Sequence, residues 1–276
     1  MAEPAQSFRD FEHAGWEDQA VCANYDEQLS RITRQSVQAL LDAAGVHRGK
    51  RVLDVATGAG YVAGAAAERG AEAFGIDFSA VQITMARQRY PGVRFEQSDA
   101  DALPFPAASF DAVVSAFGMP HFPDPDAVVR EAYRVLKPGG RFAFTVWDVP
   151  DKVIGFGAIY DAIRAHGTMD VGLPVGPHFF LFSDPEQSKR VLTGAGFRSP
   201  SISYVPQVWR VSAPERVFDD TLKGSVRASA TLRGQSPEAR EAIKAAVRKT
   251  ISGFRRGDQY EVPMPAVLAA AIKPAP

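Results

Sequence analysis

The sequence has little cysteine, no excess of charge of either sign and no long apolar run. Cys22 is the one cysteine in 276 residues, so neither an internal disulfide nor a multi-cysteine metal site can form. The net charge is −1, and no concentrated basic run marks a nucleic-acid surface. The stretches free of Asp, Glu, Lys and Arg, at 55–67 and 171–183, are too short to span a bilayer. We therefore expect no nucleic-acid partner, no stable membrane insertion and a location in the reducing cytoplasm.

What is present is an alternation of short apolar strands and helical patterns. Strands are predicted at 51–55, 73–76, 93–95, 110–116 and 141–147, with helices at 61–69, 79–90 and 125–136. Ser79 and Asp124 are suited to cap the second and third of these helices, and Gly70 to end the first. Apolar strands joined by helices predict a parallel sheet covered on both faces, which binds ligands at the carboxyl ends of its strands.

The flanking segments are less regular. Residues 1–15 are predicted to form a loose polar arm, and apolar positions from Leu29 to Ala44 predict an amphipathic helix over 26–44. Residues 201–211 are strand-like, 213–254 mostly helical, and 266–272 a last strand. Ser183 and Ser212 each begin a Ser-x-x-Glu pattern, which predicts a capping box at the start of a helix.

The strongest motif is Val-Leu-Asp-Val-Ala-Thr-Gly-Ala-Gly at 52–60. A strand delivers Asp54, and the chain then turns through Gly58 and Gly60 into a helix whose first N–H groups are free to meet a ligand. On its own this pattern also resembles the fingerprint of a nicotinamide dinucleotide site.

Four further motifs follow in order. Phe-Gly-Ile-Asp-Phe-Ser ends a strand with Asp77, Ser98–Phe105 follows the next strand, Phe110–Ser115 is the fourth strand, and Leu136–Phe142 leads into the fifth. With Asp54 and its glycines, this series resembles the class I S-adenosylmethionine (SAM) dependent methyltransferases, closest to their ubiquinone/menaquinone-biosynthesis-like small-molecule branch. Ala56 departs from the family pattern, which has a glycine there.

The resemblance implies a cofactor site for SAM and its product S-adenosylhomocysteine. Asp77 would bind the ribose diol, Asp99 the adenine amino group, and Ala100 would offer a backbone N–H. The full set implied is Tyr25, Asp54, Ala56, Gly58, Gly60, Asp77, Phe78, Gln82, Asp99, Ala100, Ser115 and Phe117. Turn-capping acids and core aromatics are the competing interpretations of these side chains, above all for Tyr25 and Phe117.

The family fold implies an α/β protein with a seven-stranded, doubly wound Rossmann-like sheet whose last strand is antiparallel. We expect one methyltransferase domain over 1–276. Its parts are a helical cap (1–45), a SAM-binding core (46–148), substrate-cavity insertions (149–183 and 212–258) and remaining core (184–211 and 259–276). Residues 1–30 are expected to order over the cofactor as a lid.

The expected function is in-line transfer of the SAM methyl group to a small, apolar or aromatic acceptor. Aromatic residues are expected to line the cavity: Phe156, Phe179, Phe180, Phe182, Trp209 and Phe218. His121, shortly after the fourth strand, is the candidate catalytic base, with a turn residue as the alternative. The five histidines show no zinc-ligand spacing, so no metal is expected.

Three other functions stay open at this point. The chain could bind SAM for chemistry other than methyl transfer, bind a nicotinamide cofactor, or bind SAM as a catalytically silent regulator. The acceptor, the atom that is methylated and the oligomeric state, a homodimer among the options, are not determined by these motifs.

Overall fold

The structure is a computed structural model that describes residues 7–275. The chain divides into two compact units. The sheet unit holds residues 33–147, 177–205 and 266–275, and the helical unit holds 7–32, 148–176 and 206–265. The division of one domain into cap, core and insertions stays a prediction.

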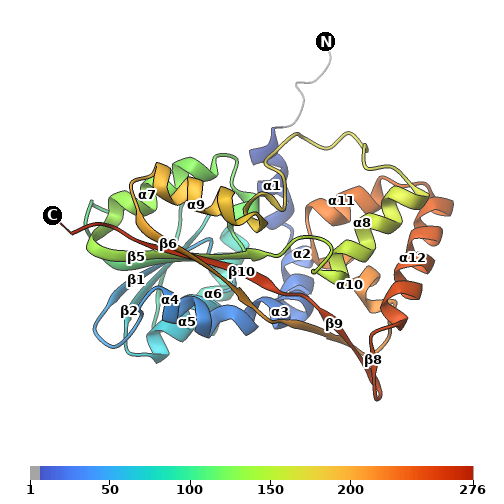
Figure 1. The fold of residues 1–276 in the computed structure, drawn as a ribbon, viewed down its shortest axis with the longest axis horizontal. Helices are drawn as coiled ribbons and strands as arrows, with labels where there is room; N and C mark the ends of the chain where they lie inside the picture. Colours follow the sequence, from blue (N-terminus) through green and yellow to red (C-terminus); the bar gives the residue numbers. More distant parts are fainter. Residues whose placement is uncertain (1–6, 276) are drawn as a thin grey trace, which may run out of the picture. The chain divides into compact units, whose positions relative to one another are not determined.

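A seven-stranded sheet forms the centre of the sheet unit within the described residues (Figure 1). Its strand order is β3-β2-β1-β4-β5-β10-β6. The strands are β1 (Arg51–Val55), β2 (Glu72–Asp77), β3 (Arg94–Gln97), β4 (Phe110–Ala116), β5 (Leu136–Trp147), β6 (Arg198–Val205) and β10 (Ala266–Ile272). The pairs among β1 to β5 are parallel, whereas β10 runs antiparallel to both β5 and β6. The predicted fold, including its antiparallel last strand, is confirmed.

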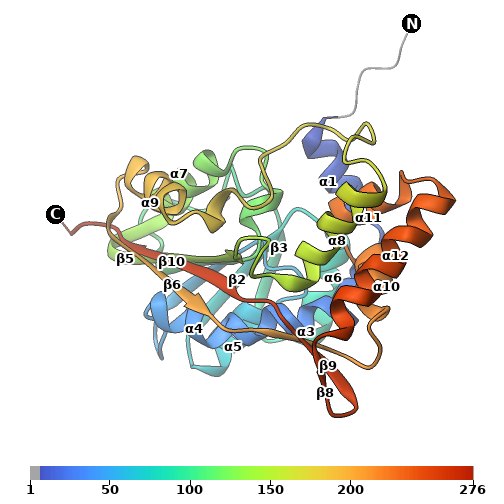
Figure 2. The ribbon, with the colours of Figure 1, turned by 45° about the vertical axis from the view of Figure 1, so that its right-hand side comes forward.

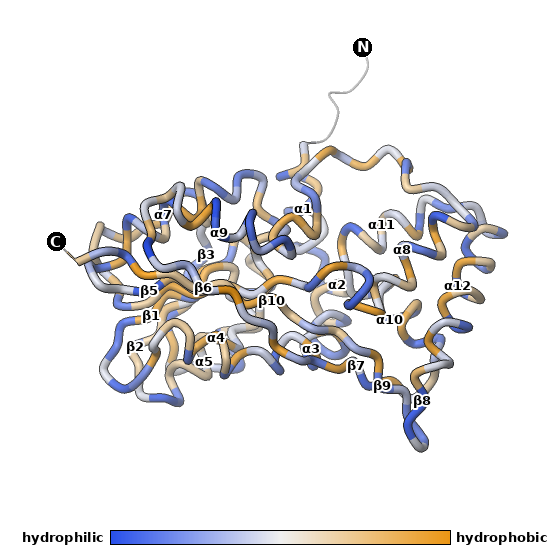
Figure 3. The backbone as a smooth tube through the Cα atoms, viewed as in Figure 1, coloured by the Kyte–Doolittle hydropathy of each residue, from blue (hydrophilic) through white to orange (hydrophobic). Residues whose placement is uncertain are grey.

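Helices cover both faces of this sheet because successive strand residues alternate between two apolar cores. The strand residues that point to the same face as Leu53 pack against α7 (Pro125–Val135) and α9 (Pro185–Gly194). The strand residues that point to the same face as Val52 pack against α4 (Val37–Ala43), α5 (Tyr61–Glu68) and α6 (Ala80–Arg89). The strands follow hydrophobic stretches of the chain, and the two helix sets lie on opposite sides of them (Figures 1 and 3). The sheet unit also holds the 3-10 turns η2 (Arg34–Ser36), η3 (Met119–His121) and η4 (Leu181–Ser183).

The helical unit consists of helices and a small antiparallel sheet of order β7-β9-β8. Its helices are α1 (Phe8–Trp16), α2 (Gln19–Asn24), the π-helical turn η1 (Tyr25–Leu29), α8 (Ile154–His166), α10 (Arg216–Gly224), α11 (Arg227–Arg233) and α12 (Pro237–Ser252), and its strands β7 (Val208–Val211), β8 (Arg255–Arg256) and β9 (Gln259–Pro263). Helix α3 (Ser30–Thr33) joins the two units. Figure 2 shows α8 and α12 side by side, with the β8–β9 hairpin after α12. Within residues 7–275, no helix has both the length and the apolar character needed to cross a membrane.

The structure confirms several local signals. The hydroxyl of Ser79 accepts the backbone N–H of Gln82 at the start of α6, and the carboxylate of Asp124 accepts that of Ala127 at the start of α7. Both caps satisfy N–H groups that a helix start would otherwise leave without partners.

The N-terminal predictions need correction. Residues 1–6 of the predicted arm lie outside the described residues, but Phe8–Trp16 is a helix, since Ser7 caps it and Phe8 is buried. The helix predicted over 26–44 changes type along its length, from a π turn through a 3-10 turn to α4. The hydroxyls of Ser30 and Ser36 bond the backbone carbonyls of Asp26 and Thr33, and such bonds compete with regular helix geometry.

Two predicted capping boxes are wrong. The hydroxyl of Ser183 donates to the carbonyl oxygen of Trp147 at 2.7 Å, and Asp184 caps α9 instead. The helix predicted to start at Ser212 begins at Arg216 as α10, with no side-chain cap at Glu215. The strand-like segment 201–211 is also divided, because β6 pairs with β10 in one sheet and β7 pairs with β9 in the other.

Candidate functional site

The turn after β1 brings a buried carboxylate beside an open stretch of backbone. Gly58 and Gly60 have φ of 53° and 84°, in the left-handed region that glycine adopts at little cost. A Cβ added at Gly58 would have Gln82 Oε1, at 3.7 Å, as its one neighbour within 4 Å. The turn therefore leaves space at Gly58 for a ligand to approach the main chain.

Asp54, at the end of β1, is 1% exposed. Its Oδ2 accepts hydrogen bonds from the Thr57 hydroxyl at 2.6 Å and the Ala63 N–H at 3.1 Å. Its Oδ1 is buried and has no hydrogen-bond partner among the described residues. Burial raises the pKa of the Asp54 carboxyl to about 7, against the lowering effect of the bonds from Thr57 and Ala63. The site thus offers one buried acceptor that a cationic donor would satisfy.

Asp77, at the end of β2, holds two turns together. Its Oδ2 accepts the N–H of Gly58 at 2.9 Å, and its Oδ1 accepts the N–H of Ser79 at 3.0 Å. A carboxylate oxygen has more than one lone pair, so each oxygen can accept more than one hydrogen bond. The bond to Gly58 brings Asp77 and the glycine turn together, as the sequence predicts.

The loop after β3 lies beside the end of β2. The N–H of Ser98 donates to the Asp77 carbonyl at 3.0 Å, and the Gln97 side chain donates to the Phe78 carbonyl at 2.8 Å. Asp99 follows as an exposed residue, and Ala100 packs against the sheet core. Gln82, in the first turn of α6, is buried with its amide near Gly58.

The end of β4 supplies the predicted residues Ser115 and Phe117. The buried Ser115 hydroxyl has no hydrogen-bond partner within residues 7–275. Phe117 adopts a φ of 58°, which is rare for a bulky side chain, and its ring packs on that of Trp147 with centroids 4.3 Å apart. β4 lies next to β1, so these residues belong to the same edge of the sheet as Asp54.

His121 ends the short turn η3 that follows Phe117. Its side chain is half-buried, and its ring meets the edge of Phe179 with centroids 6.1 Å apart. Its backbone N–H donates to the carbonyl of Gly118 at 2.9 Å, which fixes the turn next to the β4 end.

Tyr25 belongs to the helical unit, where it begins the π turn η1. Its ring meets that of Trp16 edge-on, with centroids 5.2 Å apart. A role of Tyr25 at the cofactor stays a prediction.

The structure favours core packing for most of the aromatic residues expected to line a cavity. Phe156, Phe182, Trp209 and Phe218 are buried, and only Phe179 and Phe180 are half-exposed. Phe156 packs on Trp209 in the helical unit, and Phe182 packs on Phe144 in the sheet unit. These contacts bury large apolar rings among other rings, which stabilises each core.

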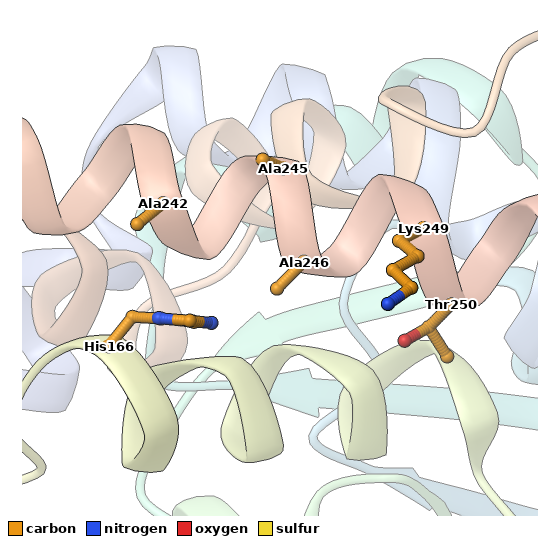
Figure 4. Close-up of a pocket in the computed structure, with 6 residues that line it drawn as sticks. All are labelled: His166, Ala242, Ala245, Ala246, Lys249 and Thr250. Atoms are coloured by element: carbon orange, nitrogen blue, oxygen red, sulfur yellow. The ribbon is translucent and has the colours of Figure 1, made fainter.

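A shallow pocket lies elsewhere, between α8 and α12 of the helical unit (Figure 4). It has a volume of about 690 Å³ and is lined by His166, Ala242, Ala245, Ala246, Lys249 and Thr250. It shares no residue with the predicted cofactor set.

Sequence reasoning missed three residues at the sheet edge. The Thr57 hydroxyl donates a hydrogen bond to Asp54, and the Trp147 ring packs against the Phe117 ring. The guanidinium of Arg89 donates to the Ala59 carbonyl at 3.2 Å. Thr57 and Trp147 could have been found, since one lies inside the glycine motif and the other ends a predicted strand. Arg89 gives no local signal, because its contact depends on how α6 packs.

The motif series matches a known domain. The profile of a methyltransferase domain family covers residues 53–144. The demethylmenaquinone methyltransferase of Thermus thermophilus is 37% identical over 183 residues, which is 60% of this chain and 81% of that protein. The ubiquinone/menaquinone biosynthesis C-methyltransferase of Pectobacterium atrosepticum is 30% identical over 197 residues, 64% of this chain and 77% of that protein.

Solved structures share the fold at lower identity. YcgJ of Bacillus subtilis aligns with a TM-score of 0.56 and 21% identity, over 87% of this chain and 99% of that one. A phosphoethanolamine N-methyltransferase of Haemonchus contortus, solved with S-adenosylhomocysteine, aligns with a TM-score of 0.59 and 21% identity, over 98% of this chain and 60% of that one. From the sequence similarity, the chain belongs to the family of SAM-dependent small-molecule methyltransferases that includes the demethylmenaquinone methyltransferases.

Proposed function

We propose that this enzyme methylates a ring carbon of a small, quinol-type aromatic acceptor. The observation that carries the proposal is the 37% identity to a demethylmenaquinone methyltransferase across 81% of that protein's length. The relative named a C-methyltransferase supports carbon as the methylated atom. The half-exposed rings of Phe179 and Phe180, which pack together beside His121, support an aromatic acceptor.

The cofactor site that we propose is the edge formed by the ends of β1, β2 and β4. The chemistry of the donors and acceptors fits SAM, which carries an ammonium group and a ribose diol. The unsatisfied Asp54 Oδ1 suits the ammonium group, and the Asp77 carboxylate suits the diol. The open backbone at Gly58 lets the cofactor approach closely.

The remaining predicted residues complete this site. Phe78, Gln82, Asp99 and Ala100 border it from the β2 and β3 side, and Ala56, Ser115 and Phe117 from the β1 and β4 side.

When bound, SAM supplies a methyl group that its sulfonium makes electrophilic. The protein holds the acceptor in line with that group and keeps water away. Loss of a hydroxyl proton makes the acceptor ring carbon more nucleophilic, and the imidazole of His121 would take that proton. The proton on the methylated ring carbon leaves only after the new C–C bond has formed, which restores the aromatic ring. The ring of Phe179 fixes the His121 side chain from one side.

The direct test supplies a reduced, short-chain demethylmenaquinone together with SAM carrying a ¹³C-labelled methyl group. We expect S-adenosylhomocysteine release and an NMR signal of a methyl group on an aromatic carbon. An O-methyl signal would contradict carbon as the target. SAM binding with no turnover on any quinol or phenol would favour the silent or non-transferring alternatives.

The same proposal assigns the enzyme to the cytoplasm, with no nucleic-acid partner. The near-balanced net charge of −1 and the single cysteine, which is buried, support this assignment.

A further inference from the structure

At two neighbouring strand ends, the residue type is not the one that the backbone conformation would lead us to expect. Ala56 has a φ of 57°, a left-handed conformation in which glycine is the usual residue. Gly118 has φ −76° and ψ −32°, a right-handed conformation that residues with a side chain adopt easily. The backbone conformation therefore explains neither the alanine at 56 nor the glycine at 118.

Close approach explains Gly118. A Cβ added there would lie 2.7 Å from Oγ of Ser115, 2.8 Å from the Cβ of Ala56 and 3.2 Å from Cζ of Phe122. The Ser115 hydroxyl can rotate away, whereas the methyl group of Ala56 cannot move without its backbone. Gly118 is thus needed because the Ala56 methyl group occupies the space where its side chain would stand.

This contact lies at the topological switch point of the sheet, where the strand order reverses. β1 has β2 on one side and β4 on the other, and both pairs are parallel. In open α/β sheets the crevice at such a point binds the ligand. Ala56 follows β1 and precedes the glycine turn, and Gly118 follows β4 and precedes the turn of His121.

The backbone next to Gly118 is held in a strained form. Phe117 has a φ of 58°, and it keeps this conformation while its N–H donates to the Thr145 carbonyl at 2.9 Å and its ring packs on Trp147. Strained backbone persists only where surrounding contacts enforce it, and it gathers at binding sites.

We propose that Ala56 and Gly118 are a matched pair of positioning residues for the cofactor site. The Ala56 methyl group, set against a residue without a side chain, fixes the distance between the β1 and β4 loops. It thereby fixes the Phe117 ring at the crevice. This inference rests on the cofactor site proposed above, and it adds that residue 118 must be chosen together with residue 56.

A double-mutant cycle tests the pairing. The variants are Gly118→Ala, Ala56→Gly and the two combined, and Gly92→Ala is the control because a Cβ there meets nothing within 4 Å. Calorimetry gives the affinity for S-adenosylhomocysteine, and steady-state kinetics gives KM for SAM and kcat separately. Since overpacking forces the backbone to shift, we expect Gly118→Ala to weaken binding about tenfold or more. The combined variant should recover to within about threefold of the natural protein, since neighbours in contact are not additive.

A positioning role also predicts how much KM for SAM and kcat should each change. Gly118→Ala should raise KM for SAM more than it lowers kcat at saturating SAM, and a role in stability alone would lower the melting temperature without moving KM. If Gly118→Ala does not fold, recovery of soluble, binding-competent protein in the combined variant supports the pairing.

Two results would overturn the pairing: normal affinity in Gly118→Ala, or a combined variant that binds as weakly as Gly118→Ala or stays unfolded with it. Asp77→Asn separates this inference from the site on which it rests. Unchanged affinity in Asp77→Asn removes the proposed cofactor site itself. Weak binding in Asp77→Asn without recovery in the combined variant removes only the pairing.

Discussion

The carboxylate of Asp77 accepts the backbone N–H of Gly58 at 2.9 Å, and this bond ties the end of β2 to the turn after β1. Because the same carboxylate accepts the N–H of Ser79, it fixes two chain segments around one point. The acid that would bind the ribose is therefore also part of the framework of the site.

Replacement of Asp77 by alanine is expected to weaken S-adenosylhomocysteine binding by about 1.5–3 kcal/mol, the scale of a hydrogen bond to a charged group. Calorimetry measures the change, with Asp126→Ala on α7 as a control for loss of a surface carboxylate. Because Asp77 also orders the glycine turn, the melting temperature should fall as well. Unchanged affinity would exclude Asp77 from the ribose site.

Cofactor binding should depend on the protonation of Asp54. Burial raises the pKa of this carboxyl to about 7, and a bound ammonium group would stabilise the ionised form. Below about pH 7, binding must first remove the proton, so affinity is expected to fall as the pH decreases from about 8 to about 6. Calorimetry in two buffers with different ionisation enthalpies should show proton release, and Asp54→Asn should abolish it. An affinity that is the same at both ends of this range contradicts the assignment.

The ligand-free protein should show the opposite trend in stability. The folded pKa of Asp54, about 7, lies above the value of 3.8 for a free aspartate, so the folded state holds the proton more tightly. The contribution of Asp54 to the free energy of unfolding is then largest at low pH and declines as the pH rises from about 4 to about 7. Urea unfolding of the natural protein and of Asp54→Asn gives this contribution by difference. A difference that does not change with pH would count against a raised pKa.

Arg89 is expected to stabilise the glycine turn. Its guanidinium lies 4.5 Å from the Tyr61 ring centroid and also bonds the Ala59 carbonyl. Arg89→Ala should lower the free energy of unfolding by about 1–2 kcal/mol, the sum of a cation–π contact and a hydrogen bond. Tyr61→Phe is the matched background, because it keeps the ring face under the guanidinium, so Arg89→Ala should cost the same about 1–2 kcal/mol in it. A loss that disappears in this background would contradict a contact with the ring face.

His121→Ala tests the proposed base. With saturating SAM and a quinol acceptor, turnover should fall on the order of a hundredfold or more, while cofactor affinity stays nearly constant. His47→Ala, at an exposed position, is the control. A loss of less than about tenfold across roughly pH 6–9 would remove His121 as the base and leave alignment as the main source of rate enhancement.

The sequence by itself determined the architecture and predicted the edge of the sheet at which the site is proposed. Apolar strands with helical spacing between them specify a parallel sheet, because such strands can be buried only with helices on both faces. The Asp54–Gly60 motif, Asp77 and the caps at Ser79 and Asp124 depend on contacts within a few residues or on adjacent strand ends. Local chemistry is sufficient for them.

Tertiary packing decided the remaining features, because their partners lie far away in the chain. Ser183 has the sequence of a helix cap, yet its hydroxyl bonds Trp147, and Asp184 takes its place. The strand-like run 201–211 is shared between two sheets, since each half finds a different partner strand. Gly118 carries no sign of its importance until the fold brings it against Ala56, where space and not conformation excludes a side chain. Sequence patterns report what a residue can do locally, whereas a close approach between two loops exists only after the strands that carry them have paired.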